Sequence, residues 1–407
     1  MVNIAVLGYG TVGSGVVEVI DRNGGSINMK SGRDIRIKYV LDLRDFPGDR
    51  VEPILVHDFD VILNDPEVKI VVEVMGGVEP AYTFVKKSLL AGKSVCTSNK
   101  ELVAKHGPEL IAIAREHNIN FLFEASVGGG IPVIRPINSS LTADPIVEIR
   151  GILNGTTNYI LTQMDVAGWD FDKALATAQS VGYAERNPEA DIEGYDATRK
   201  IAILASLAFG RNVDYEKIYT EGISKITVTD MLYAKKLGGA IKLLGSCTKQ
   251  GDSYYAMVAP FIVGSDHPLY AVSGVYNAIF IRGDAIGNVM FYGSGAGKLP
   301  TACAVVSDIV DAAKHLDKHI YTFWSPEELT LAGTGGAVRS FFARVSGSPA
   351  DCEAEIKETF GSVRFIQIDE APGEFGFVTD PVTEQSFDEN IKKIPGVLGR
   401  IRLESSI

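Results

Sequence analysis

The feature that most limits how this chain can fold is the alternation of short apolar segments with longer segments of helical spacing in residues 1–125. Strands are predicted over residues 2–7, 35–42, 69–75, 93–97 and 119–124, with helices over residues 11–20, 80–91 and 108–117. This alternation predicts a doubly wound parallel sheet with right-handed crossovers. Ligands bind such a sheet at the carboxyl ends of its strands.

A glycine-rich turn, GYGTVG, follows the first predicted strand and begins the first predicted helix. Gly8, Gly10 and Gly13 have the spacing that a dinucleotide site uses for a tight turn, close approach to the pyrophosphate and helix–strand packing. The helix start also favours phosphate charge. A purely structural turn is the alternative, but the flanking strand and helix favour a nucleotide. The predicted cofactor contacts here are Gly8, Tyr9, Gly10, Thr11, Val12 and Gly13, with Met75 and Gly76 at the end of a neighbouring strand.

The end of the second predicted strand bears on the choice of cofactor. Asp42 stands there and Arg44 follows it. A carboxylate at this position can accept a hydrogen bond from the ribose 2′-hydroxyl of NAD, whereas an arginine suits the 2′-phosphate of NADP. Both residues are present, and we interpret Asp42 as favouring NAD.

The segment Gly182–Lys200 gathers many charged side chains between a turn and an apolar run. Asp196 and Lys200 are four residues apart. If a helix begins near Asp196, both side chains point the same way, one turn apart. A carboxylate beside an ammonium can bind a zwitterion or move a proton. A surface ion pair, worth only a few tenths of a kcal/mol, is the plain alternative.

Three further positions are candidates for a pocket. Lys100 follows a strand that should end at the crevice, although it could be a solvated lysine. Glu124 precedes a glycine run whose carbonyls could hold a monovalent or hard cation; a flexible hinge explains the run equally well. Gly155 and Thr156 join a strand to a helix, where they could contact a substrate or only cap the helix.

The pattern divides the chain into three parts. Residues 1–130 are predicted to form the dinucleotide-binding domain, with residues 300–325 returning to it. Residues 131–299 mix strands and helices, including a helix over 216–223, and are predicted to be an α+β substrate and dimerisation domain. Residues 338–407 have the order strand, helix, strand, strand, helix, strand, which is typical of a ferredoxin-like module.

Composition narrows the class of partner. The 407 residues carry a net charge of −12 without a basic run, which argues against nucleic acid and for small-molecule ligands. The four cysteines are scattered, as in a reduced cytoplasmic protein. We find no signal peptide and no apolar run long enough to span a membrane. His315 and His319 have metal-ligand spacing, but solvated helix residues explain them better.

Several motifs together resemble the homoserine dehydrogenase family. They are GYGTVG, VVEVMGG, SNKELVAKHG, FEASVGGGIP, GILNGTTNYIL, GYAERNPEADIEGYDATRKIAILA and GSGAGKLPTACAVVSDI, in family order over roughly residues 1–325. The resemblance implies reversible reduction of L-aspartate 4-semialdehyde to L-homoserine with NADH or NADPH, in threonine and methionine biosynthesis. It also implies a homodimer or a homotetramer.

The resemblance assigns roles to particular residues. Lys200 matches the catalytic proton donor, and Lys100 matches the lysine between cofactor and substrate. Glu185 and Asp196 match carboxylates that contact homoserine, with Asp191 close by. Gly182 and Gly297 match backbone contacts to the cofactor, while Glu124, Val127, Gly129 and Ile131 match the ligands of a sodium ion.

Three alternatives stay open. The last 70 residues or so resemble an ACT-type regulatory module by strand order, so they could mediate threonine feedback or serve dimer packing only. An aspartate-semialdehyde or diaminopimelate enzyme is a rival, although the semialdehyde dehydrogenase needs a nucleophilic cysteine that this chain does not evidently provide. A non-catalytic amino-acid sensor is the rival from another class, and the joint presence of Lys100, Glu185, Asp196 and Lys200 argues against it.

Overall fold

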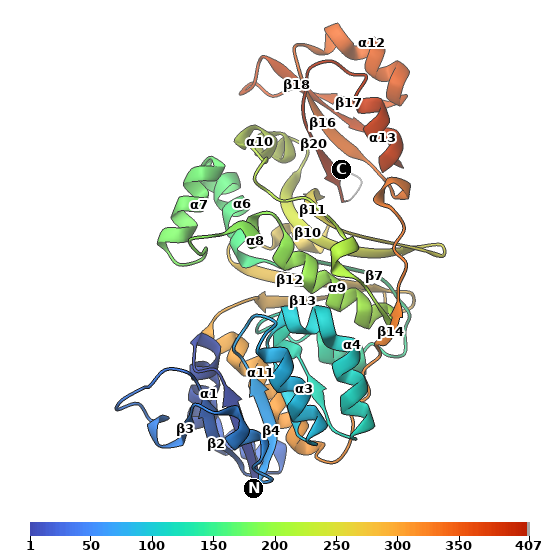
Figure 1. Cartoon of the computed structure of the whole chain (residues 1–407). Helices are drawn as coiled ribbons and strands as arrows, with labels where there is room; N and C mark the ends of the chain where they lie inside the picture. Colours follow the sequence, from blue (N-terminus) through green and yellow to red (C-terminus); the bar gives the residue numbers. More distant parts are fainter. Residues whose placement is uncertain (405–407) are drawn as a thin grey trace.

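The structure, a computed structural model, describes residues 1–404 (Figure 1). Its amino-terminal part is built on a parallel sheet in the order β3-β2-β1-β4-β5-β6, which is the Rossmann order. The strands are β1 (Val2–Leu7), β2 (Ile35–Leu41), β3 (Leu55–Val56), β4 (Val68–Glu73), β5 (Ser94–Thr97) and β6 (Phe121–Leu122). The predicted doubly wound sheet is therefore confirmed.

Helices cover both faces of this sheet. The alternate side chains of β1 divide between two cores: Ile4 and Val6 pack with α1 and α11, whereas Ala5 and Leu7 pack with α3 and α4. The helices are α1 (Thr11–Ser31), α2 (Phe59–Leu63), α3 (Ala81–Leu90), α4 (Lys100–Glu116) and α11 (Lys298–Lys314). Helix α11 reaches this sheet from far along the chain and lies against α1. The contact is so close that a Cβ on Gly15 would lie 2.8 Å from the carbonyl oxygen of Lys298.

Two helices of this part are longer than predicted. Helix α1 runs on to Ser31, beyond the predicted end at residue 20. Helix α4 begins at Lys100 and not at Pro108, because the side chain of Asn99 accepts a hydrogen bond from the amide of Leu102 and caps the helix there. Pro108 lies inside the helix. Lys100 is consequently the first residue of a helix and not part of an open turn.

A second, mixed sheet forms the middle of the molecule and continues into the carboxyl-terminal part. Its order is β13-β12-β7-β10-β11-β20-β16-β18-β17, with β9 also paired to β11. The strands are β7 (Ile146–Ile152), β9 (Tyr219–Thr220), β10 (Gly239–Gln250), β11 (Ser253–Gly264), β12 (Tyr276–Gly283), β13 (Asn288–Ser294), β16 (Phe341–Ser346), β17 (Val363–Ile366), β18 (Glu374–Thr379) and β20 (Val397–Leu403). Short pairs join β8 (Arg211–Asn212) to β14 (Ser325–Glu328), and β15 (Val338–Arg339) to β19 (Val382–Thr383).

The helices of the middle part pack directly on strands of the second sheet, as α6, α9 and α10 do, or against one of these helices (Figure 1). They are α5 (Ile134–Ser139), α6 (Gly155–Ala167), α7 (Phe171–Ser180), α8 (Glu189–Ile192), α9 (Tyr195–Phe209) and α10 (Val228–Lys236). The predicted helix over residues 216–223 is wrong. A 3₁₀ turn, Tyr215–Lys217, is followed there by β9, because Tyr219 and Thr220 pair with Met257 and Val258 of β11.

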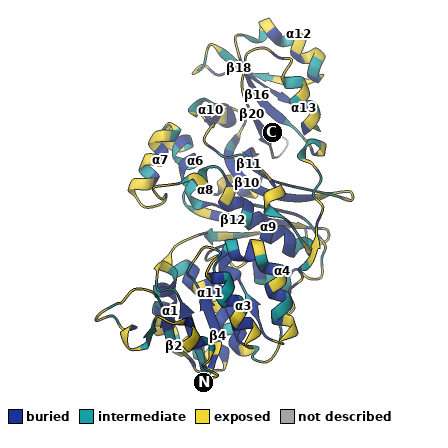
Figure 2. Ribbon diagram, viewed as in Figure 1, coloured by how far each residue is buried: buried dark blue, intermediate teal, exposed yellow. Residues whose placement is uncertain are grey.

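The carboxyl-terminal part has the predicted βαββαβ order. Its helices are α12 (Pro349–Phe360) and α13 (Glu384–Ile391), and its strands lie in the ferredoxin-like order β20-β16-β18-β17. Strand β20 also pairs in parallel with β11, so the two parts share one sheet. The buried residues follow the two sheets through the whole molecule (Figure 2). Among the helices of residues 1–404, none is both long and apolar enough to cross a membrane.

Candidate active site

Two lysines and one aspartate meet where α9 begins. Asp196 and Lys200 are one turn apart on α9, and Lys200 Nζ lies 2.6 Å from Asp196 Oδ2. Lys100 Nζ, at the start of α4, lies 2.6 Å from Asp196 Oδ1. Asp196 and Lys200 are buried, whereas the side chain of Lys100 is 39% exposed. One carboxylate thus holds two ammonium groups that come from different parts of the fold.

The charges of this cluster depend on one another. Burial by itself would raise the pKa of Asp196, but the ammonium groups of Lys200 and Lys100 outweigh burial and hold that pKa below its ordinary value. Burial by itself would lower the pKa of Lys100, but Asp196 outweighs it and raises that pKa. The cluster therefore carries more positive than negative charge, which suits an oxygen atom that becomes negative during a reaction.

Asn154 is a member of this site to which the sequence analysis gave no role. Its Nδ2 donates to Asp191 Oδ1 at 2.7 Å and to Asp196 Oδ2 at 2.9 Å, while its Oδ1 caps α6. The carbonyl of the preceding Leu153 accepts from Lys200 Nζ at 2.7 Å. Burial and the charge of Asp196 raise the pKa of Asp191. The signal in the sequence was an asparagine placed directly between a strand and a helix.

A buried acid supports the segment that leads to Lys100. Glu73 ends β4 and is fully buried, and its side chain accepts hydrogen bonds from Thr97 Oγ1 at 2.6 Å and from the amide of Met75 at 2.8 Å. Thr97 Oγ1 in turn accepts from the amide of Asn99, the cap of α4, at 2.9 Å. Burial raises the pKa of Glu73. This chain of contacts fixes the two strand ends at the crevice and so positions Lys100.

The glycine-rich turn has the geometry that a nucleotide fingerprint requires. Gly8 has a φ of 99°, which favours glycine, and a Cβ on Gly13 would lie 1.9 Å from the carbonyl oxygen of Gly8. A Cβ on Gly10, by contrast, would meet nothing within 4 Å. That open side leaves room for a phosphate at the start of α1. Thr11 is exposed beside it, and Val12 packs against the core.

A cavity of about 520 Å³ adjoins this turn. Its lining includes Gly8, Gly10, Asp42, Arg44, Met75 and Gly76. Asp42 Oδ2 accepts from the amide of Tyr9 at 2.8 Å, and Asp42 Oδ1 accepts from Arg44 Nε at 2.9 Å. Its bond to Arg44 holds the pKa of Asp42 well below the ordinary value, although burial acts against it. The two residues that bear on cofactor choice are therefore paired with each other.

The remaining predicted residues lie at the start of α6, on the loop that follows Gly182 and at the start of α11. Thr156 Oγ1 donates to the carbonyl of Tyr183 at 2.6 Å, which ties the start of α6 to the loop that follows Gly182. Gly155 packs closely under the carbonyl of Val275. Glu185 is exposed on the loop that follows Gly182, and within residues 1–404 no contact joins its carboxylate to Lys100, Asp196 or Lys200. Gly297 caps α11 with a φ of 123°.

The carboxylate of Glu124 is engaged by the protein itself. Its Oε1 accepts from the amides of Val133 and Ile134 at 2.6 and 2.8 Å, and its Oε2 accepts from the amide of Arg135 at 2.7 Å. Val127 and Ile131 are buried nearby, and Gly129 packs against the backbone of Gly295. The residues described hold no cluster of three or more metal-ligating side chains. Val127, Gly129 and Ile131 could bind sodium only through their backbone carbonyls, so the sodium site stays a prediction.

Comparison with known proteins identifies the family. The model of the homoserine dehydrogenase NAD-binding domain matches residues 8–124, and the homoserine dehydrogenase model matches residues 132–310. The homoserine dehydrogenase of Synechocystis sp. is 44% identical over 315 residues, which are 76% of this chain and 73% of that protein. The chain belongs to the homoserine dehydrogenase family.

Solved structures extend the likeness to the carboxyl-terminal part. A homoserine dehydrogenase from Thiobacillus denitrificans has a TM-score of 0.89 and 35% identity, and the match covers 99% of this chain and 98% of that one. A homoserine dehydrogenase of Staphylococcus aureus, whose crystal structure was determined at pH 7.5, has a TM-score of 0.82 and 35% identity over 100% and 99% of the two chains. Residues beyond 310 lie outside both family models, but these two structures cover them.

The family gives the activity. The chain is an NAD(P)-dependent oxidoreductase, EC 1.1.1.3, of aspartate-family amino-acid biosynthesis. It interconverts L-aspartate 4-semialdehyde and L-homoserine, the substrates that the family implies. The predicted enzyme class is thereby confirmed over the non-catalytic sensor.

Proposed function

We propose that Lys200 is the proton donor to the aldehyde oxygen of aspartate semialdehyde and the proton acceptor when homoserine is oxidised. The observation that carries this proposal is the pairing of Lys200 with Asp196 and the carbonyl of Leu153, which together fix its Nζ. When bound, NAD(P)H supplies the hydride. The oxygen of the aldehyde then gains negative charge, which an ammonium group stabilises and protonates.

Lys100 and Asp196 tune this proton transfer. Asp196 orients both ammonium groups, and it stabilises the charged form of Lys100. For oxidation the neutral amine of Lys200 accepts the hydroxyl proton of homoserine, and Lys100 lies on the other oxygen of Asp196. Lys100 acts in this proposal as a catalytic residue between cofactor and substrate, and Asp196 as the group that holds the pair.

Acidic residues recognise the ammonium group of the substrate. We assign this role to Glu185, Asp191 and Asp196, with Gly155 and Thr156 at the start of α6 providing polar contacts. Asn154 supports it, because one amide group holds Asp191 and Asp196 together. Loss of a buried charged contact to the substrate costs roughly 2–4 kcal/mol of binding free energy.

The decisive experiment removes the proton donor. Lys200→Ala is expected to lower kcat for homoserine oxidation by orders of magnitude, because no other group then donates or accepts the proton, while NADH still binds with near-normal affinity. Spectrophotometric turnover and quenching of protein fluorescence by NADH measure the two quantities. Lys236→Ala, at an exposed position of α10, is the control. A Lys200→Ala enzyme that reduced the semialdehyde at a near-normal rate would exclude Lys200 as the donor.

For the cofactor we propose NAD in preference to NADP, through Asp42. Its carboxylate lies in the cofactor cavity and carries a negative charge that repels a 2′-phosphate. Arg44 gives the chain a means of accepting NADP, since its guanidinium could leave Asp42 for the phosphate. One relative supports the NADP alternative. It is an archaeal homoserine dehydrogenase mutant in complex with NADPH, with 30% identity and a TM-score of 0.65 over 76% of this chain.

Kinetics with each cofactor test this choice. The wild type is expected to have the higher kcat/KM with NAD, and Asp42→Ala should shift the ratio toward NADP because the repulsion is removed. Arg44→Ala should shift it the other way. Equal use of both cofactors by the wild type would remove Asp42 from the argument.

We further propose that the protein assembles as a homodimer or a homotetramer through its middle part, which light scattering on the purified chain would measure.

The contacts of Glu124 are explained without a sodium ion, so no step of the mechanism uses one.

A further inference from the structure

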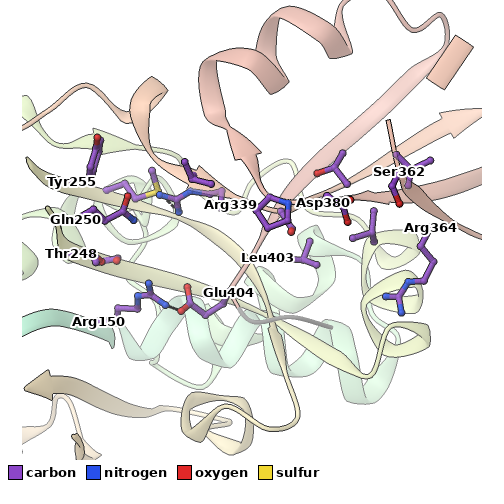
Figure 3. A pocket seen from close by; sticks show the side chains of 18 residues that line it. Arg150, Thr248, Gln250, Tyr255, Arg339, Ser362, Arg364, Asp380, Leu403 and Glu404 are labelled. Carbon is purple, nitrogen blue, oxygen red and sulfur yellow. Dashed lines mark hydrogen bonds and ion pairs between the residues drawn. The ribbon is translucent and has the colours of Figure 1, made fainter. Parts of the chain in front are cut away.

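A second cavity, of about 610 Å³, lies between the middle part and the carboxyl-terminal part of the molecule (Figure 3). It shares no lining residue with the catalytic cluster or with the cofactor cavity. One wall is the outer face of the sheet, with Arg150 on β7 and the pair of strands β10 and β11. The opposite wall comes from the carboxyl-terminal part and includes Arg339 and Arg364, together with the carboxylates of Asp380 and Glu404.

The sheet wall of this cavity is polar. Ser246, Thr248 and Gln250 are alternate residues of β10, so their side chains point to the same face. Tyr255 and Met257 lie opposite them on β11. Ser246 and Thr248 are buried, and buried hydroxyl groups are unusual lining for a hydrophobic partner, because each polar group loses water without gaining a bond. The lining fits a small polar ligand.

Arg339 is the group in this cavity that most lacks partners. Its Nη1 donates to the thioether of Met257 at 3.5 Å, a weak acceptor, and its buried Nε has no hydrogen-bond partner within residues 1–404. Glu384 Oε2 lies 3.6 Å from that Nε, too far for a hydrogen bond, whereas Glu384 Oε1 accepts from Arg402. Burial lowers the pKa of Arg339 to about 10, and Arg402 and Arg150 act in the same direction against Glu384. An incoming anion would satisfy these donors.

We propose that this cavity binds a small oxyanion, either a carboxylate or a phosphate group, with the guanidinium fork of Arg339 as its anchor. Arginine presents parallel N–H groups that match the two oxygens of such an anion. The hydroxyl groups of Ser246 and Thr248 line the same cavity and offer further donors. The proposal concerns a site apart from catalysis, so it stands or falls independently of the role of Lys200.

Two strands of the cavity wall lead directly to the catalytic cluster. Strand β7 carries Arg150 and ends just before Leu153, whose carbonyl holds Lys200. Strand β11 presents Val258 on its other face, where a Cβ on Gly194, the cap of α9, would come within 3.0 Å of the Val258 side chain. We therefore expect an anion in the cavity to change the rate of homoserine oxidation.

Titration calorimetry on the full chain tests the site, with inorganic phosphate and malonate as separate probes at constant ionic strength. Saturating NAD⁺ keeps the pyrophosphate site filled. Arg339→Gln is expected to weaken binding of the preferred probe at least about ten-fold, because charged hydrogen bonds are lost. Arg339→Lys should fall between, since it keeps the charge and loses the fork. Arg211→Gln, outside the cavity, should bind as the wild type does.

Each outcome is decisive. Absence of binding to the wild type, or equal binding by Arg339→Gln, overturns the proposal. Preference for phosphate or for malonate decides the chemical source of the anion. If Arg339→Gln fails to fold, Arg339→Lys and Thr248→Val carry the test in its place. If the anion still binds to Lys200→Ala, and if it alters the turnover of the wild type and of Arg211→Gln, both the site and its connection to α9 are supported. If the anion binds without changing turnover, the site is supported and the connection is removed.

Discussion

At the scale of the residue, Lys242 shows what burial does to one charge. It lies on β10, is 4% exposed, and donates from Nζ to the carbonyl of Val272 at 2.5 Å. Burial lowers its pKa to about 8, although the more distant Asp165 acts against this. In the unfolded chain the same lysine has a pKa of about 10.4. The folded state therefore releases a proton that the unfolded chain still binds.

This difference predicts a pH dependence of stability. Between pH 8 and about pH 10.4 the unfolded chain binds more protons, so the contribution of Lys242 to the free energy of unfolding rises with pH, by up to about 1.4 kcal/mol per unit. Below pH 8 both states are protonated and the contribution is constant. Urea unfolding of the wild type and Lys242→Met across this range measures the gap, with Lys236→Met as the control for loss of a lysine. A gap that does not change with pH would contradict the burial argument.

Residues of the candidate site were predictable where their partners are close along the chain. Asp196 and Lys200 could be paired because helical spacing alone brings them together. Lys100 could be placed at the crevice, but its contact with Asp196 depends on how two sheets pack, which no local pattern contains. No role in the site was predicted for Asn154, because an asparagine at a strand–helix junction is most often only a cap.

At the scale of the element, the glycine-rich turn separates two demands on glycine. Gly13 is required by packing, since the carbonyl of Gly8 occupies the place of a Cβ. For Gly10 we propose a requirement of the ligand, because its open side faces the start of α1, where a pyrophosphate would approach.

Two alanine substitutions test this separation. Gly13→Ala is expected to lower the free energy of unfolding by about 2–3 kcal/mol, because the turn must shift to admit the methyl group. Gly10→Ala should change it by less than about 0.5 kcal/mol and yet weaken NADH binding. Thermal unfolding and fluorescence titration give the two quantities. Normal cofactor binding by Gly10→Ala would show that the pyrophosphate lies elsewhere.

Elements of the first sheet were predictable because strands buried on both faces form continuous apolar runs. The predicted boundaries of helices and strands were wrong where the same residues are compatible with two structures. Proline is common at the start of a helix, so a helix start was predicted at Pro108. The cap at Asn99 begins α4 earlier. The segment 216–223 was interpreted as a helix, and its pairing with the distant strand β11 made part of it a strand.

At the scale of the whole molecule, a buried ion pair joins the carboxyl-terminal part to the middle. Arg402 of β20 is 1% exposed and donates to Glu384 at 2.9 Å and to Glu221 at 2.6 Å. It lies where β20 pairs with Phe261 of β11. The two parts should therefore unfold together.

Arg402→Gln is expected to lower the free energy of unfolding by about 3–5 kcal/mol, because it leaves the carboxylate of Glu384 buried without its nearest cation. Arg400→Gln on the same strand should cost less than about 1 kcal/mol, since its ion pairs are longer, at 3.5 and 3.7 Å. Calorimetry measures both, and two separate transitions in the wild type would contradict the shared sheet.

The ferredoxin-like order of the carboxyl-terminal part was predictable from its own strands and helices. Its fusion to the second sheet was not, because β11 and β20 are far apart in sequence and pair over only a few residues. A cavity between those two parts is likewise a product of assembly and leaves no local motif.

The return of α11 to the first sheet also dictates an order of events during synthesis. The ribosome releases residues 1–124 long before it releases Lys298–Lys314, so the face of the nascent sheet beside α1 waits exposed while the whole middle part emerges. Such an apolar face is a target for chaperones and for aggregation. A folding defect in the middle part should thus leave this face of the first sheet uncovered by α11, even though no residue of the sheet has changed.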